Sequence, residues 1–405
     1  MLEIKKGYLL TTFPIFYLIL VFRASLDPIL NLTKFGGIGV GAILNLVLVC
    51  MFFVLFFQRQ TVPKIFFVPW IVFSTITIVS SLWSPDLVNS LRSSFWILTY
   101  MSAFLIPFFF SDAKRCYESV LYLVILSFAI PLVVGLLDIA TNLTGIVGGV
   151  YRIKSTFSHP NIFAFYLTQV LFAVLAMRTI AIKDNRNIFG SNLGLIIIGV
   201  VSVFIILTQT RSAWGVTLVL LAVHCAVNEK RLFMPMVLSC LLIAAFPPVT
   251  ERILDALSSA DTYYDPYAKL NSFEWRVIVW ESAMPWIYDN LWIGYGFNSF
   301  GYYFLDFVLL EEDNSFDAHN MYIQYLFDLG LIGLLSYFIL AIITIYYLLI
   351  GKRHHSSGTL VLVCFIAYSL CGISDNISFY LSFNWYFWLV IGAYLSLVYR
   401  ETVVR

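Results

Sequence analysis

Long apolar segments recur along the whole chain, and they constrain its fold more than any other feature of the sequence. Of the 405 residues, 60% are hydrophobic and 12% are charged, whereas an average soluble protein carries about 25% charged residues. A chain this poor in charge cannot cover a compact soluble domain with polar surface, so its solvent must be lipid. Disordered, collagen-like, disulfide-framework and soluble nucleic-acid-binding proteins are excluded on the same ground.

Polar, glycine and proline segments divide the apolar sequence into twelve runs. A helix needs about 20 apolar residues to cross a bilayer, and we therefore predict an all-α, polytopic integral membrane protein with about twelve transmembrane helices. The predicted spans are residues 8–24, 36–57, 65–83, 93–110, 119–139, 161–180, 189–207, 213–227, 232–249, 331–350, 359–373 and 380–398.

The distribution of Lys and Arg predicts the orientation of these spans, because positive residues are retained on the cytoplasmic side of a membrane. With the N-terminus inside, the inner segments hold 15 of the 24 basic residues and the outer segments hold 17 of the 23 acidic residues. We therefore expect both termini to be cytoplasmic. The first apolar run follows two lysines but has no clear small-residue cleavage site, which favours a retained helix over a signal peptide.

One outer connection is far longer than the others, and we expect function to reside there. It divides the chain into residues 1–249 with spans one to nine, a large outer loop at 250–330, and residues 331–405 with the last three spans. Within the loop, residues 273–288 have the pattern of an amphipathic helix at the membrane surface.

Nine basic residues fall on the outer side, where the orientation rule disfavours them. We interpret Arg23, Lys34 and Arg92, close to span ends, as residues that extend toward lipid headgroups. The other six form three clusters. They are Arg152 with Lys154, then Arg211, and finally Arg252, Lys269 and Arg276.

Arg211 lies in a very short outer turn, at the predicted N-terminus of the eighth span. The helix dipole favours anions there, and a guanidinium is well suited to bind phosphate. A headgroup anchor or a surface salt bridge is the alternative. Arg276 could instead pair with Glu274 or stack on Trp280.

Two histidines stand at outer span ends. A neutral imidazole at the position of His319 could act as a general base, although a lone histidine is more often a hydrogen-bonded polar residue. His159 precedes Pro160 at a helix start, where capping is an adequate explanation. The sequence contains no metal-ligand spacing, no supported Ser/His/Asp order and no glycine-rich phosphate loop.

Seven short stretches between residues 80 and 395 carry a resemblance to a known group of proteins. They are Leu82-Trp83-Ser84-Pro85, Ser155-Thr156-Phe157-Ser158-His159-Pro160-Asn161, Leu207-Thr208-Gln209-Thr210-Arg211-Ser212, Glu274-Trp275-Arg276 with Trp280, Gly294-Tyr295-Gly296-Phe297, His319-Asn320 to Leu329-Gly330-Leu331-Ile332-Gly333, and Ser374-Asp375. In this order they resemble the O-antigen ligase and O-antigen polymerase superfamily, the polytopic glycosyltransferases of bacterial surface-polysaccharide assembly.

The resemblance implies a fold similar to GT-C membrane glycosyltransferases, a location in the bacterial inner membrane and an active site on the periplasmic face. It implies that an undecaprenyl-diphosphate-linked glycan is transferred to a saccharide acceptor, with inversion and with no metal, nucleotide sugar or other cofactor. Membrane lipids are further partners, nucleic acid is not, and binding of a chain-length regulator stays open.

The resemblance also implies roles for individual residues. Arg211 and Arg276, helped by Arg152 or Lys154, would stabilise the negative charge on the diphosphate, and His319 would activate or orient the acceptor hydroxyl. The residues expected to contact substrate are His159, Asn161, Asn320, Trp280 and Tyr263.

The acceptor distinguishes a polymerase, which extends a lipid-linked repeat unit, from a ligase, which modifies the lipid A core. Ligases often show His-x10-Gly, which His319 and Gly330 satisfy, and Arg-x3-Leu, which fails because residue 215 is glycine. The Ser-His-Pro-Asn stretch is more familiar in polymerase-like members. We favour a polymerase and keep a ligase as the alternative.

A polysaccharide transporter or flippase is the alternative from another class. It would place ionisable residues near the bilayer midplane and broken helices in two related halves. The spans show almost no central charges and no evident symmetry, so transport is the less favoured interpretation.

Overall fold

The computed structural model describes most of the chain. The described residues are 17–25, 34–35, 38–59, 62–141, 146–147, 150–186, 192–245, 247–257, 272–308 and 316–403.

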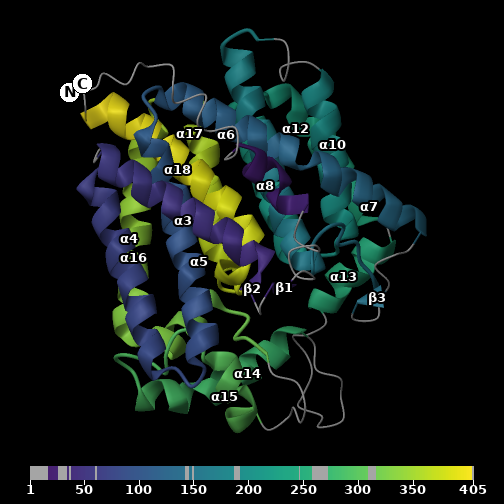
Figure 1. Ribbon diagram of the computed structural model, residues 1–405. Helices are drawn as coiled ribbons and strands as arrows, with labels where there is room; N and C mark the ends of the chain where they lie inside the picture. Colours follow the sequence, from purple (N-terminus) through teal and green to yellow (C-terminus); the bar gives the residue numbers. More distant parts are fainter. Residues whose placement is uncertain are drawn as a thin grey trace, which may run out of the picture.

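Helices dominate these ranges (Figure 1). The α-helices are a helix at 17–25 and α3 (Val40–Arg59), α4 (Lys64–Ser80), α5 (Leu87–Leu105), α6 (Ala113–Ser127), α7 (Ala129–Thr141), α8 (Pro160–Lys183), α10 (Asn192–Leu207), α11 (Arg211–Val227), α12 (Phe233–Ala244), α13 (Pro247–Leu257), α14 (Ser272–Asp289), α15 (Phe300–Phe307), α16 (Met321–Gly351), α17 (Gly358–Cys371) and α18 (Leu381–Val403). Short 3-10 turns are η1 (Ser81–Trp83), η2 (Ile106–Phe109), η3 (Lys230–Leu232) and η5 (Ile377–Phe379).

The described residues also include four strands of two residues each. β1 (Lys34–Phe35) pairs antiparallel with β2 (Ile38–Gly39), and β3 (Ile146–Val147) pairs antiparallel with β4 (Val150–Tyr151).

Within the described ranges, six helical segments are long and apolar enough to cross a membrane. They are Gly41–Gln58, Lys64–Trp83, Ala113–Thr141, Pro160–Lys183, Met321–Gly351 and Leu381–Thr402, and α10, α11 and α17 are shorter apolar helices. The prediction of an all-helical polytopic membrane protein is therefore confirmed. The number of twelve crossings stays a prediction.

The predicted span at 232–249 differs most from the structure. Its first part is α12, a helix of 12 residues, which is about 18 Å long against a hydrocarbon core of about 30 Å. Pro247 then begins a separate helix, α13. A proline is well accommodated in the first turn of a helix but not in its interior, so it favours a new start here.

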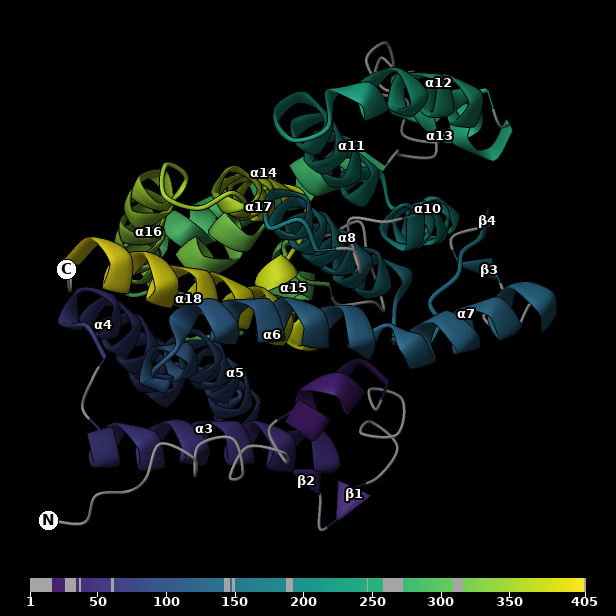
Figure 2. The same cartoon turned by 90° about the horizontal axis from the view of Figure 1, so that it is seen from above.

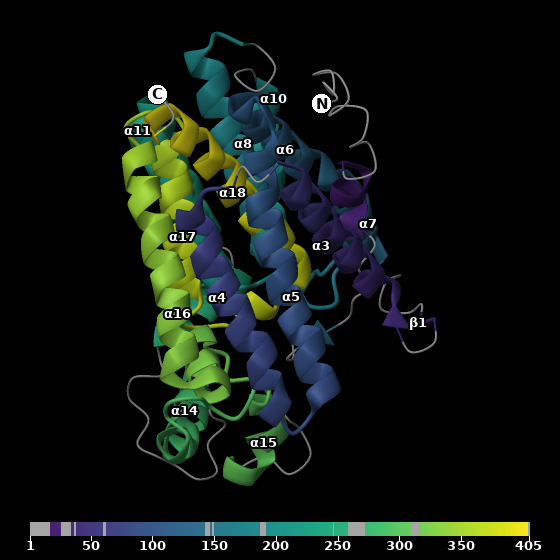
Figure 3. The same cartoon turned by 60° about the vertical axis from the view of Figure 1, so that its left-hand side comes forward.

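The helices α8 and α18 form the centre of the molecule. Buried residues make up 89% of the α8 span and 94% of the α18 span, but only 28% of the α3 span. Around this centre α18 packs against α5 and α6, α8 packs against α10, and α16 packs against α4 (Figures 2 and 3). Apolar residues at the periphery, such as those of α3, therefore provide the surface available to lipid.

Arg23 is an exception to the predicted pattern of outer cations. Its side chain is 3% exposed, and its guanidinium lies 5.5 Å from the ring centroid of Trp385 in α18. The prediction that Arg23 extends toward lipid headgroups is wrong, because packing against an aromatic ring holds it in the core.

The helices α14 and α15 lie together at one end of the molecule (Figure 1). The predicted amphipathic segment at 273–288 is confirmed as a helix, α14. Both helices pack on the first turns of α16 through a second apolar cluster, separate from the main core, whose buried members include Val279, Phe300, Phe304 and Phe327.

The helix α16 is broken at Gly330. The break separates its first turns, which pack in this second cluster, from the apolar segment that follows. Gly330 adopts φ 64°, and a Cβ atom there would lie 2.3 Å from the backbone carbon of Trp292, so only glycine fits. The backbone groups of Leu331 and Ile332 donate to the carbonyls of Leu291 and Trp292. The predicted span start at residue 331 coincides with this break.

Candidate functional site

A cavity of about 700 Å³ lies near α14 and α15, where several distant segments meet. Its lining comes from the start of α5, the start of α8, the turn before α15, the residues before α16 and the segment between α17 and α18. Of the predicted site residues, His159, Asn161 and His319 line it.

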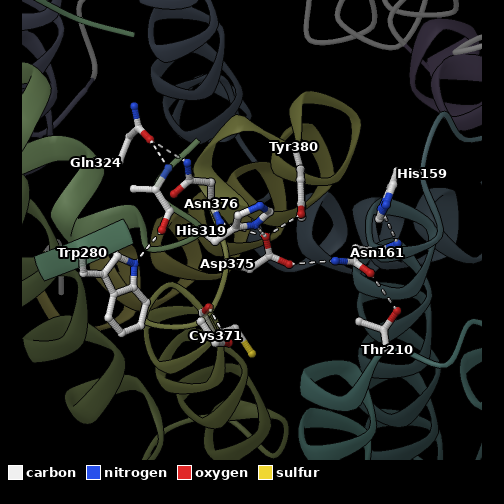
Figure 4. A network of polar contacts seen from close by, with 12 residues as sticks. His159, Asn161, Thr210, Trp280, His319, Gln324, Cys371, Asp375, Asn376 and Tyr380 are labelled. Carbon is white, nitrogen blue, oxygen red and sulfur yellow. Dashed lines mark hydrogen bonds and ion pairs between the residues drawn. The ribbon is translucent and has the colours of Figure 1, made fainter. Parts of the chain in front are cut away.

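Asp375 is the centre of the polar network beside this cavity (Figure 4). Its side chain is 3% exposed. The hydroxyl of Tyr380 donates to Oδ1 at 2.7 Å, and Nδ2 of Asn161 donates to Oδ2 at 3.1 Å. Both carboxylate oxygens are therefore held in a fixed orientation, as a buried carboxylate requires.

Asn161 connects this carboxylate to the first basic cluster. Its Oδ1 accepts from Nη2 of Arg152 at 2.6 Å and from the hydroxyl of Thr210 at 3.3 Å. Arg152 also donates through Nε to the carbonyl of Thr208 at 2.8 Å. The residues before α8 and before α11, predicted as separate outer clusters, thus form one continuous network.

His319 is the next member, in a strained backbone conformation with φ 47°. Its Nδ1 lies 3.9 Å from Oδ1 of Asp375, within ion-pair range but longer than a hydrogen bond. Its ring makes an edge contact with Trp275, with centroids 5.6 Å apart. The preceding Ala318 is fixed on both sides, since its carbonyl accepts from Trp280 and its N–H donates to Gln324.

Arg276 is within electrostatic reach of both Asp375 and Arg211, because the charge of Asp375 raises its pKa and the charge of Arg211 lowers it. Arg276 projects from the first turns of α14 and Arg211 begins α11. Both side chains are half-buried. The network therefore brings together cations from the long loop and from a short turn that lies 65 residues earlier in the sequence.

Burial and charge shift the pKa values of these groups. Burial would raise the pKa of the Asp375 carboxyl, but the neighbouring His319, Tyr380 and Arg276 lower it below its ordinary value, so Asp375 is ionised at neutral pH. Burial lowers the pKa of Arg276, although Asp375 opposes this. Burial and then Arg152 lower the pKa of His159, which favours its neutral form.

Residues 194–338 match the family described as O-antigen ligase. This match covers less than half of the chain, and it supports the predicted resemblance to the O-antigen ligase and polymerase superfamily. The matched region includes Arg211, Arg276 and His319 but ends before Asp375. No curated protein matches the chain. The superfamily indicates a function of the O-antigen ligase or polymerase type, within a membrane context.

The remaining predicted site residues lie outside the cavity lining or outside the described residues. Asn320 is 6% exposed and caps α16, accepting from the N–H groups of Tyr322 and Ile323. Trp280 packs in the second apolar cluster and orients the backbone before His319. Neither residue lines the cavity. Lys154 is half-buried beside the network, and Tyr263 lies outside the described residues.

Two residues that sequence reasoning did not assign to the site are Asp375 and Tyr380. A signal for the first was present, because Asp375 is the only Asp, Glu, Lys or Arg between Arg353 and Arg400. A lone carboxylate next to apolar spans needs a partner or a function. Tyr380 gave no such signal, since aromatic residues are common at span ends.

Across the described residues, no three His, Cys, Asp or Glu side chains are arranged to hold a metal ion. The expectation of metal-independent chemistry stays a prediction. The groups present can bind an anion through two guanidinium groups and can accept a proton at an imidazole next to a carboxylate. These are the two capabilities needed to transfer a glycosyl group from a phosphate leaving group to a hydroxyl.

Proposed function

We propose that this protein is a glycosyltransferase of bacterial surface-polysaccharide assembly, located in the inner membrane. It transfers a glycan from undecaprenyl diphosphate to a saccharide acceptor, and it does so as a polymerase. One observation supports the proposal above all: the buried Asp375 is within ion-pair range of His319 and interacts electrostatically with Arg276, which in turn interacts with Arg211.

The reaction is a single displacement at the anomeric carbon. The acceptor oxygen forms a bond to this carbon while the bond to the diphosphate oxygen breaks, which inverts the configuration. The electron pair leaves with the diphosphate, whose growing charge Arg276 and Arg211 stabilise. The hydroxyl proton passes to the imidazole of His319, and Asp375 stabilises the resulting imidazolium.

The surrounding residues position these groups. Arg152 uses its donors on Asn161, Thr210 and Thr208, so we assign it to holding the network and the start of α11 in place. The buried Asp375 attracts both His319 and Arg276, which keeps the base next to the diphosphate site.

The structure changes the weight of the sequence patterns that distinguish a ligase from a polymerase. Gly330 of the His-x10-Gly pattern is required by the backbone break, so its presence favours neither enzyme. At Gly215 a Cβ atom would meet nothing within 4 Å, so the fold does not require the glycine that replaces the ligase leucine. The proposal of a polymerase is thus supported by the Ser-His-Pro-Asn stretch and by the failure of the Arg-x3-Leu pattern.

A polysaccharide gel tests the proposal and separates the two enzymes. A strain lacking this protein is complemented with the wild type or with Arg211→Ala, and protein abundance is measured by immunoblot. A polymerase predicts lipid A core with a single repeat unit in the deletion strain and in the variant. Bare core with accumulated lipid-linked polymer would identify a ligase, and unaltered glycan would favour the transporter interpretation.

Orientation is part of the proposal. We place the cavity on the periplasmic face and both termini in the cytoplasm, because the inner segments carry most of the Lys and Arg residues. Single cysteines introduced at Asp306 and at Arg353 should react differently with a membrane-impermeant maleimide in intact spheroplasts. Only the first should be labelled, and the opposite pattern would reverse the topology.

A further inference from the structure

The cavity lining includes Asp375 but neither of the two arginines assigned to the diphosphate. Arg276 and Arg211 interact electrostatically with each other, and Arg276 does so with Asp375. Within the described part of the chain, the charged residues of the lining other than histidine are three carboxylates, Asp86, Asp317 and Asp375, with no Lys or Arg. A cavity of this charge attracts cationic groups, accepts neutral groups and repels anions.

Two buried polar atoms at the cavity have no hydrogen-bond partner among the described residues. One is Oδ1 of Asn376, whose side chain is 3% exposed, and the other is Nδ1 of His319. The amide nitrogen of Asn376 is already used, since it donates to Oε1 of Gln324 at 2.8 Å. A buried acceptor without a donor is costly, and a ligand hydroxyl would satisfy it.

Aromatic and amide side chains complete the cavity wall. Trp96 is half-buried and contacts Phe379 edge to face, with centroids 6.2 Å apart. Tyr302 is 62% exposed, although large aromatic side chains are usually packed. Asn89 is exposed on the first turn of α5. Flat apolar faces beside amide groups match the alternating CH and OH surfaces of a sugar ring.

We propose that this cavity binds the acceptor saccharide and that its carboxylates select neutral or amino sugars over acidic sugars. The proposal rests on the function proposed above and adds the place and the charge of the acceptor. In this arrangement the donor diphosphate binds at Arg276 and Arg211, the acceptor ring binds in the cavity, and His319, which lines the cavity near Asp375, serves both. Asp86, at the exposed edge, is the residue that contributes most to excluding a sugar carboxylate.

Saturation-transfer NMR on the full-length protein in nanodiscs tests this proposal directly. The probes are methyl β-glucoside, methyl β-glucosaminide and methyl β-glucuronide, which differ by one substituent each. We expect the first two to bind and the glucuronide to bind at least about threefold more weakly, since a screened carboxylate repels another across a few ångströms. Equal or tighter binding of the glucuronide would overturn the proposal, as would no binding of any probe.

Matched variants locate the site. Asp86→Asn removes the charge but keeps a good helix cap, because Asn and Asp cap helices equally well, and Asp86 accepts from the N–H of Asn89. This variant should bind the glucuronide roughly three- to tenfold more tightly than the wild type, and Tyr302→Ala should weaken binding of all three probes. Asp306→Asn, an exposed charge outside the lining, should change nothing. Wild-type behaviour of both Asp86→Asn and Tyr302→Ala would place any bound sugar elsewhere and overturn the proposal.

The two proposals can fail separately. Arg276→Ala should retain probe binding while it loses glycan transfer. Transfer that survives in Arg276→Ala contradicts the proposed donor site without affecting the binding result. If folded Arg276→Ala loses probe binding, the donor site and the acceptor cavity are one site, and the proposal of a separate acceptor cavity is contradicted.

Discussion

At the scale of single residues, the proposed function depends on the contacts that Asp375 makes with its neighbours. It accepts from Tyr380 and Asn161, and it lies within ion-pair range of His319. A carboxylate held by these partners attracts the imidazole and stabilises its protonated form, which is the role of the third group in general-base catalysis.

His319→Gln should therefore lower the turnover number while leaving donor binding nearly unchanged. A positioned general base contributes about 10²- to 10⁴-fold to a rate, and glutamine keeps polarity without accepting a proton. The measurement is single-turnover transfer together with donor affinity. Turnover equal to that of the wild type would remove His319 as the base.

The lowered pKa of Asp375 predicts how stability depends on pH. Its folded-state value lies below the ordinary 3.8, so its contribution is fully present above about pH 4. The contribution is lost as pH falls through the lowered value, because the unfolded state then binds a proton more readily than the native state.

Asp375→Asn should unfold at a lower temperature than the wild type at pH 7 and should lose part of the decline in stability between pH 5 and 3. Thermal unfolding followed by tryptophan fluorescence measures both. Asp306→Asn is the control for a surface carboxylate. An unchanged pH dependence in Asp375→Asn would mean that another group dominates acid unfolding.

At the scale of elements, the break at Gly330 determines the position of the segment that contains His319. It joins the turns of α16 that follow His319 to the part that begins the predicted span, and the carbonyls of Leu291 and Trp292 accept from the N–H groups that follow the break.

Gly330→Ala should destabilise the protein by roughly 3 kcal/mol or more, because the added methyl group meets backbone atoms that cannot move aside and because φ is positive. The matched control is Gly215→Ala, where nothing lies within 4 Å and alanine favours the helix by about 1 kcal/mol. Thermal stability by size-exclusion chromatography measures both variants. Equal stability of the two would contradict the described break.

A second polar element lies at the other end of α8. Arg178 and Glu229 form an ion pair, and their side chains are 1% and 3% exposed. Nε2 of His224 lies 3.2 Å from Oε2 of the same Glu229 carboxylate. Arg178 is 17 residues beyond Asn161, so about 25 Å of helix separates this pair from the cavity.

Glu229→Gln should lower membrane abundance through a loss of roughly 3–5 kcal/mol, since it leaves Arg178 buried without a full counter-charge. Transfer per folded molecule should stay near the wild-type value. Arg231→Ala is the control, because Arg231 contacts the same carboxylate but is 76% exposed. Normal abundance of Glu229→Gln would show that the pair is not structural.

At the scale of the whole molecule, sequence patterns predict the helices well, but they predict poorly which distant residues come into contact. Apolar runs locate most of the helices because each span must bury its own backbone polar groups. The positions of Arg211 and Arg276 follow from the charge rule. The meeting of Asn161 with Asp375, 214 residues apart, depends on how α8 and α18 pack, which no local pattern encodes.

The same limit explains why some residues make contacts in the structure that differ from the predicted ones. Asn320 and Trp280 carry side chains suited to sugars, but both bind nearby backbone groups instead. Asn320 caps α16 by accepting from two backbone N–H groups, and Trp280 donates to the carbonyl of Ala318. Arg23 has the charge needed to bind a lipid headgroup, but its guanidinium packs against the ring of Trp385 instead. Side-chain chemistry alone predicts what a residue can bind, and packing decides what it does bind.

The most direct test of the account is transfer by the purified full-length protein. The donor is the lipid-linked repeat unit extracted from the deletion strain, and the readouts are release of undecaprenyl diphosphate and lengthening of the glycan. We predict transfer by the wild type and by Arg92→Ala, a control for an exposed arginine, and a loss of about 10²- to 10³-fold in Arg276→Ala. Transfer by folded Arg276→Ala at the wild-type rate would contradict the central claim.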